Sequence, residues 1–235
     1  MDRVVRVLHV LGGLDAGGAE NFVMNVYQKI DREKIQFDFV KHTNKKQFFD
    51  EEIQKLGGKI YSCPKYNFIN HIAYCRWWKQ FFLAHPEYLI IHGHVRSTAS
   101  IYMKISKKNR RIAIAHSHNT SNGSGFSAII KKILQKQIKW YADYLFACSE
   151  RAGIWLYGKE AVKRNNYKMI PNAIDCERFS YNPIKRDEIR KKYQLDNLFL
   201  YDTPGLGDDP LKDSLYKENL VCMLNKTNNR KDRFS

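Results

Sequence analysis

Short apolar runs alternate with amphipathic stretches from residue 4 to residue 193. Residues 4–11 form an apolar run rich in β-branched side chains, which predicts a strand buried on both faces of a parallel sheet. After the following turn, apolar residues recur at helical spacing from Phe22 to Ile30. The same criteria predict strands at 35–40, 59–62, 88–91, 112–115, 144–147 and 167–170, and helices at 47–56, 68–83, 99–105, 126–141, 149–157 and 187–193.

This order of strands and helices predicts an α/β fold: a Rossmann-like, three-layer parallel sheet with right-handed crossovers and helices on both faces. Ligands of such sheets bind at the carboxyl ends of the strands. The residues that follow each predicted strand are therefore the candidates for a binding or catalytic site.

The turn at residues 12–18 contains four glycines and precedes a helix. Glycine allows positive φ and lets a ligand approach the backbone, and amides at a helix N-terminus favour an anion. The spacing matches neither the dinucleotide fingerprint nor the phosphate loop, since no G-x-G-x-x-G is present and Gly17 is followed by Gly18-Ala19. A tight turn without a ligand stays open as the alternative.

Two predicted strands end in a His-x-His turn, at His92 and His94 and at His116 and His118. If strand geometry persists, alternate residues point to one side and a pair could bind a metal. No third ligand stands at a useful spacing, so we expect no metal. A neutral imidazole that hydrogen-bonds a hydroxyl or orients a sugar is the favoured interpretation. The alternative is a polar strand end satisfied by backbone groups.

The formal net charge of +16 lies within residues 1–200, because residues 201–235 are charge-neutral. Such a field suits nucleic acid, anionic lipid or a phosphorylated molecule. Nucleic acid is disfavoured because Trp77 and Trp78 fall in a predicted core helix rather than on a stacking platform. The basic amphipathic stretch at 126–141 is either a peripheral contact with anionic lipid or a helix with a solvated lysine face.

The five cysteines form no C-x-x-C pair, and no apolar run is long enough to span a bilayer. The N-terminus has no signal-peptide pattern. We expect a reduced, cytoplasmic setting, with peripheral attachment at the inner face of the cell membrane as an option.

Three stretches together resemble the N-terminal domain of family 4 glycosyltransferases of the bacterial exopolysaccharide and capsule type. They are residues 11–20 with their glycines, His116-Ser117-His118-Asn119, and 170–175 with Phe179. The resemblance covers residues 4–200. It implies the acceptor-side half of a GT-B fold and a retaining, metal-independent hexosyl transfer from a nucleotide sugar to a polysaccharide or lipid-linked acceptor.

By the same resemblance, the backbone of Gly17 and Gly18 would contact the donor diphosphate and offset charge that develops on the leaving group. His118, or its neighbour His116, would contact the transferred sugar as the catalytic residue. The remaining substrate-binding residues would be His94, Arg96, Asn119 and Asn172.

Residues 201–235 resemble nothing in the family, where a second, donor-binding domain is expected. We interpret them as a divergent or frame-shifted, poorly ordered tail after a domain at 1–200. The chain alone should then transfer sugar weakly or not at all. The alternative is a non-catalytic glycan-binding or regulatory domain that partners a full-length transferase.

Overall fold

The computed structural model describes residues 4–118, 134–173, 176 and 180–193 and divides the chain into two compact units, Met1–Phe179 and Ser180–Ser235. The predicted boundary at residue 200 lies outside the described residues. So do the predicted tail, Asn119, and residues 126–133 of the predicted basic helix.

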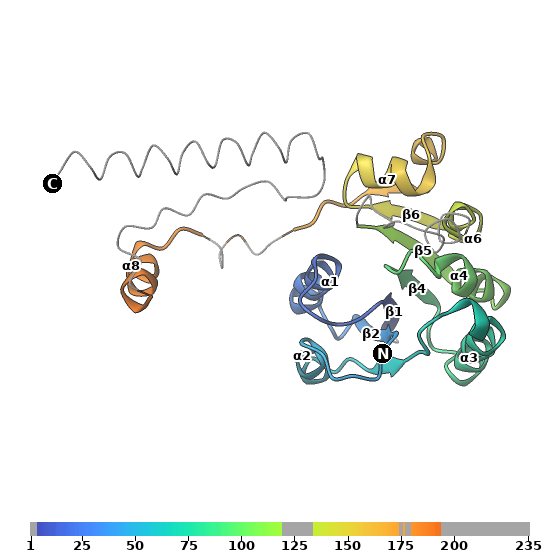
Figure 1. Ribbon diagram of the computed structural model, residues 1–235, viewed down its shortest axis with the longest axis horizontal. Helices are drawn as coiled ribbons and strands as arrows, with labels where there is room; N and C mark the ends of the chain where they lie inside the picture. The colour runs from blue at the N-terminus through green and yellow to red at the C-terminus, as the bar shows by residue number, and fades with distance from the viewer. Residues whose placement is uncertain (1–3, 119–133, 174–175, 177–179, 194–235) are drawn as a thin grey trace. The chain divides into compact units, whose positions relative to one another are not determined.

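The first unit is built on a parallel sheet of seven strands in the order β3-β2-β1-β4-β5-β6-β7 (Figure 1). This confirms the predicted fold class. The strands are β1 (Val5–Leu11), β2 (Ile35–Lys41), β3 (Ile60–Ser62), β4 (Ile90–Gly93), β5 (Ile112–Ser117), β6 (Tyr144–Ala147) and β7 (Tyr167–Met169).

The connecting helices form two layers, one on each face of the sheet (Figure 1). On one face, α1 (Gly18–Lys29) and α2 (Asp50–Lys55) bury an apolar core against β1 and β2. On the other face, α3 (His71–Ala84), α4 (Ala99–Lys108), α6 (Ile138–Tyr141) and α7 (Glu150–Tyr157) bury a second core. Right-handed crossovers require this division, since the strand order reverses its direction between β3 and β4.

Local signals explain most helix boundaries. Gly57 has φ of +84° directly after α2, which confirms the predicted glycine stop. The hydroxyl of Ser149 accepts a hydrogen bond from the amide of Ala152 and caps α7 as predicted. In the second unit, α8 (Pro183–Lys192) begins four residues before the predicted start, because Asn182 caps it and Pro183 occupies its first turn.

Two further boundaries differ from prediction. The predicted helix at 68–83 begins with a short 3₁₀ helix, η1 (Phe68–Asn70), held by reciprocal bonds between Asn67 and Asn70. The predicted helix at 47–56 begins only at Asp50. Another 3₁₀ helix, η2 (Ala161–Lys163), precedes β7. No helix within the described ranges has the length and apolar character that crossing a bilayer requires.

Candidate functional site at the carboxyl edge of the sheet

Five histidines from β1, β4 and β5 gather on the sheet face that α1 covers. His9 lies opposite His92 in the β1–β4 register. The rings of His92 and His94 are 4.4 Å apart between centroids, and those of His116 and His118 are 4.1 Å apart. Both members of each His-x-His pair therefore point to the same side. The fifth member, His9, was not singled out in the sequence because it lies inside an apolar run.

The imidazoles hydrogen-bond to one another in two groups. Nδ1 of His9 is 3.0 Å from Nε2 of His94, and Nδ1 of His94 is 2.8 Å from Nε2 of His118. A second pair joins His92 and His116 at 3.2 Å. A neutral imidazole donates from one nitrogen and accepts at the other, so the tautomer of His94 fixes the tautomers of both its neighbours.

Burial keeps these rings neutral. Desolvation and, as the smaller cause, the charge of Arg96 together lower the pKa of His118 to about 4. Desolvation likewise lowers the pKa of His92 to about 3 and of His116 to about 2, and holds those of His9 and His94 well below the usual range. Each ring is thus an uncharged hydrogen-bonding group at neutral pH.

Three nitrogens of the cluster are buried without a hydrogen-bond partner in the described structure: Nε2 of His9, Nε2 of His116 and Nδ1 of His118. A buried nitrogen without a partner costs about 1–3 kcal/mol. A hydroxyl that reached Nδ1 of His118 would satisfy the open end of the three-histidine chain, whichever way its protons run.

Helix α1 joins the three stretches that carry the family resemblance. It begins at the glycine turn, with Gly17 as its N-cap. The ring of Phe22 packs 5.1 Å from His116 and 5.6 Å from His118 between centroids. One turn later, the amide of Asn25 donates to the carbonyl of Ala173, next to the predicted site residue Asn172.

The glycine turn differs from prediction in its backbone. None of its glycines has positive φ, since the described glycines with positive φ are Gly57 and Gly158. The amide of Gly17 donates to the carbonyl of Asp15 at 2.7 Å, so it is not directed at a ligand here. A Cβ added at Gly18 would meet nothing within 4 Å. Of the two predicted diphosphate contacts, Gly18 is the one with open space beside it.

The chain's own carboxylates stand near this helix N-terminus. Glu20 lies in the first turn of α1, and its carboxylate occupies the space where a Cβ of Gly17 would lie. Burial raises the pKa of Glu20, and the charge of Asp15 raises it further. Any anion that bound at this helix N-terminus would displace the Glu20 carboxylate or favour its protonated form.

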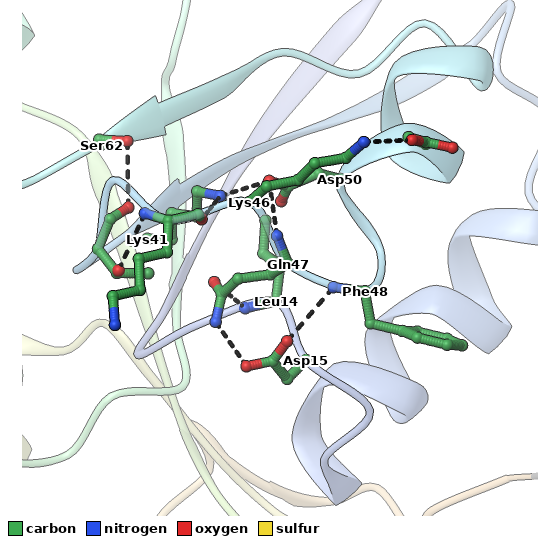
Figure 2. Close-up of polar contacts among 11 residues, drawn as sticks. Leu14, Asp15, Lys41, Lys46, Gln47, Phe48, Asp50 and Ser62 are labelled. Carbon is green, nitrogen blue, oxygen red and sulfur yellow. Dashed lines mark hydrogen bonds and ion pairs between the residues drawn. The ribbon is translucent and has the colours of Figure 1, made fainter.

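A network of side chains that the sequence did not reveal holds the turn (Figure 2). The side-chain oxygen of Gln47 accepts from the amide of Leu14 at 2.7 Å, and its nitrogen donates to the Asp15 carboxylate at 2.7 Å. The amide of Gln47 in turn donates to Asp50, which forms a buried ion pair with Lys41. This use of residues 47–49 explains why α2 begins late.

The other predicted substrate-binding residues are spread around the edge. Arg96 is half-buried, and its guanidinium lies 4.9 Å from the centre of the Trp155 ring. Asn172 is exposed, and Asn119 lies outside the described residues. The structure brings together His94, His116 and His118, whereas it records no contact between them and Asn172.

From the sequence we expect no metal because no third ligand stands near the His-x-His pairs. That reason is wrong, because the fold brings a third histidine nitrogen to each group. His94 belongs to two groups of three histidines, one with His116 and His118 and one with His9 and His92. Within each group, the candidate ligand nitrogens lie within 4.8 Å of one another. Three histidines can hold zinc without a carboxylate. Here, however, most of the facing nitrogens already share hydrogen bonds with one another, which favours a hydrogen-bonded cluster over a metal centre.

Comparisons with known proteins agree with this architecture. Residues 16–178 match the family described as Glycosyltransferase Family 4. A protein of Bacillus subtilis (strain 168) that is named as the glycosyltransferase EpsF is 35% identical over 187 residues, which cover 78% of this chain and 49% of that protein.

Two crystal structures share the fold. Anabaena HepE in complex with UDP-glucose is 16% identical, with a TM-score of 0.61 over 83% of this chain and 51% of HepE. A glycosyltransferase from Rickettsia africae ESF-5 is 14% identical, with a TM-score of 0.62 and the same two coverages. The chain spans about half the length of each of these relatives. Because the family model matches residues 16–178, the chain belongs to glycosyltransferase family 4.

Proposed function

We propose that this chain is the acceptor-side half of a retaining hexosyltransferase that uses a nucleotide sugar and a polysaccharide or lipid-linked acceptor. The observation that carries the proposal is the convergence on α1, where the glycine turn, the histidine cluster and the segment at 170–173 meet. The UDP-glucose held by HepE and the name of EpsF support a nucleotide-sugar donor and an exopolysaccharide context.

We assign the roles from the family resemblance, and the geometry supports part of them. Gly18, at the start of α1, has room for the donor diphosphate, whose departure breaks the bond between the anomeric carbon and a phosphate oxygen. His118, as a neutral imidazole, accepts from or donates to a sugar hydroxyl through Nδ1. His116 and His94 contact His118 and support its ring. By the family resemblance, His94 and Arg96 border the acceptor pocket, and Asn119 and Asn172 are further substrate-binding residues.

A donor-binding test separates this role from that of a glycan-binding or regulatory domain. In calorimetry with UDP-glucose as probe, measurable binding that is lost in Gly18→Trp supports the transferase half. Lys159→Trp, at an exposed site, is the matched control and should bind as the wild type does. Binding of an acceptor oligosaccharide without any binding of UDP-glucose would favour the alternative.

Activity is expected to be weak or absent in the chain alone, because half of the length of its relatives is not represented. Transfer of labelled glucose by the purified chain at a rate typical of glycosyltransferases would contradict this. No metal is expected to take part. Stabilisation of the wild type by added Zn²⁺, measured as a raised unfolding temperature and absent in His94→Phe, would contradict that expectation.

A cytoplasmic setting with peripheral contact at the inner membrane face is part of the same proposal. The basic stretch at 126–141 supports this part of the proposal, and its first half, residues 126–133, lies outside the described residues.

A further inference from the structure

Helix α3 presents an outward stripe of apolar and cationic side chains. Ile69, Ile72, Arg76, Lys79 and Leu83 follow one another at intervals of three and four residues, so from η1 through α3 they share one face. All five are exposed, and the exposed fractions are 98% for Ile69, 74% for Ile72 and 77% for Leu83. We call these five residues the α3 stripe.

The fold does not need these apolar side chains. The opposite side of the helix carries its packing, with Tyr74 and Trp78 at 0% exposure and Phe81 and Phe82 nearly buried. The helix is therefore anchored firmly while its outer isoleucines remain in water. Exposed apolar side chains that cluster beside polar neighbours mark an interaction surface.

The charge around the α3 stripe is positive, which favours an anionic partner. Glu87 is the only acidic residue between residues 53 and 142, a segment that includes all of α3 and α4. The neighbouring helix α4 adds Lys104, Lys107 and Lys108, and Lys65 lies exposed just before η1. By contrast, residues 12–52 contain Asp or Glu at eight positions: 15, 20, 31, 33, 38, 50, 51 and 52. The cationic field of the chain is thus concentrated on the α3 and α4 layer.

The stripe begins at the same sheet edge as the candidate site. His42, which follows β2, contacts the carbonyl of Leu11 at 3.0 Å through Nδ1 and the hydroxyl of Tyr74 at 2.8 Å through Nε2. This histidine ties the start of α3 to the base of the glycine turn. A surface that met Ile69 and Ile72 would lie along the rim where the acceptor is proposed to enter.

We propose that the α3 stripe docks the protein on an anionic lipid bilayer, with the isoleucines and Leu83 at the acyl boundary and Arg76 and Lys79 at the headgroups. An amphiphilic helix face of this kind binds in the plane of the interface and does not span it. The long stems of Arg76 and Lys79 let their charges reach the phosphates while their methylene groups lie on apolar surface. This inference rests on the peripheral membrane contact of the proposed function and assigns it a surface. Docking requires no sugar donor, so vesicle binding and donor binding can fail separately.

Co-sedimentation of the full chain with vesicles tests the proposal. We expect binding to vesicles of phosphatidylcholine that contain phosphatidylglycerol, and little binding to phosphatidylcholine alone. Ile69→Asp with Ile72→Asp should lower the partition coefficient by roughly tenfold or more, and Arg76→Gln with Lys79→Gln by about tenfold. All substituted sites are exposed, so the unfolding temperature should remain within a few degrees of the wild type.

Matched controls separate a specific surface from the general positive charge. Leu89→Asp with Met169→Asp adds the same two charges at apolar sites outside α3 that are 60% and 54% exposed. Lys159→Gln with Lys168→Gln removes the same charge as the double cation variant. If these controls reduce binding as much as the α3 variants do, the proposal is wrong. Self-association in sedimentation velocity that is lost in the isoleucine variants, with no vesicle binding, would replace the bilayer with a second copy of the chain.

Discussion

The two helical layers pack against faces of the sheet that differ in composition. The α3, α4, α6 and α7 layer buries a large core that includes Tyr74, Trp78 and Tyr102. In the α1 and α2 layer, the face of the sheet carries five buried or half-buried histidines where apolar residues would pack as well. Buried polar groups cost free energy unless they are paired, so one layer supplies stability, whereas the other gives up some of it for the candidate site.

The two faces of the sheet also differ in how much of them the helices cover. Within the described ranges, α1 and α2 are the helices on the histidine face, and Ile112 and Tyr144 on that side of β5 and β6 are each 44% exposed. A parallel sheet is normally covered on both faces. Both residues begin their strands, so this uncovered area lies toward the amino edge of the sheet, away from the histidines at the carboxyl edge.

The largest expected effect comes from the stable layer. Trp78→Ala removes a fully buried indole from the core and should lower the free energy of unfolding by about 3–5 kcal/mol, because a cavity of that size cannot collapse. Urea unfolding followed by circular dichroism measures it. Trp140→Ala makes the same deletion at a site that is 59% exposed and should cost less than about 1 kcal/mol. Equal losses in the two variants would remove the distinction between the layers.

Acid should destabilise the chain through the histidine layer. The folded pKa of His118, about 4, lies below its usual 6.5, so the unfolded chain binds its proton first. The stability gained from the neutral ring is complete above pH 6.5 and is lost as the pH falls toward 4, by at most about 1.4 kcal/mol per pH unit for each such histidine. His118→Phe should flatten this decline in unfolding experiments, and His71→Phe, at an exposed site, should not. A wild-type stability that stays constant across this range would contradict the neutral cluster.

Much of this architecture could be predicted from the sequence, because local signals set it. Apolar runs placed every strand to within about two residues, and Gly57 and Ser149 marked helix ends. The histidine site could be predicted only in part. His9 hides in a buried strand, and its bond to His94 depends on a strand register that no local pattern encodes.

Long-range side-chain contacts explain the remaining misses. Gln47 lies 33 residues from Leu14 and has no special local signature. The missing third ligand beside His116 and His118 is likewise supplied from another strand, by His94. Both are products of tertiary packing, so sequence spacing could not reveal them.

Replacing the central histidine tests whether the chain of imidazoles sets the state of His118. His94→Phe keeps a planar aromatic ring, slightly larger than imidazole, but leaves Nδ1 of His9 and Nε2 of His118 without their bonds, which should cost about 1–3 kcal/mol. Long-range ¹H–¹⁵N NMR of the imidazoles should show one tautomer of His118 in the wild type and a mixture in the variant. His71→Phe is the control. An unchanged His118 spectrum in His94→Phe would show that the pairing has no orienting role.

The smallest effect is expected where the α1 layer meets its supporting loop. Gln47→Ala removes the bonds to Leu14 and Asp15 from an accessible turn, so the loss in the free energy of unfolding should be only about 1 kcal/mol. Hydrogen exchange is the sharper measurement, because the amide of Leu14 should lose protection while amides in α3 keep theirs. Gln54→Ala, at an exposed site of α2, should leave both unchanged. If protection were lost evenly over both layers, Gln47 would stabilise the whole domain rather than the glycine turn in particular. The proposed local role of Gln47 would then be wrong.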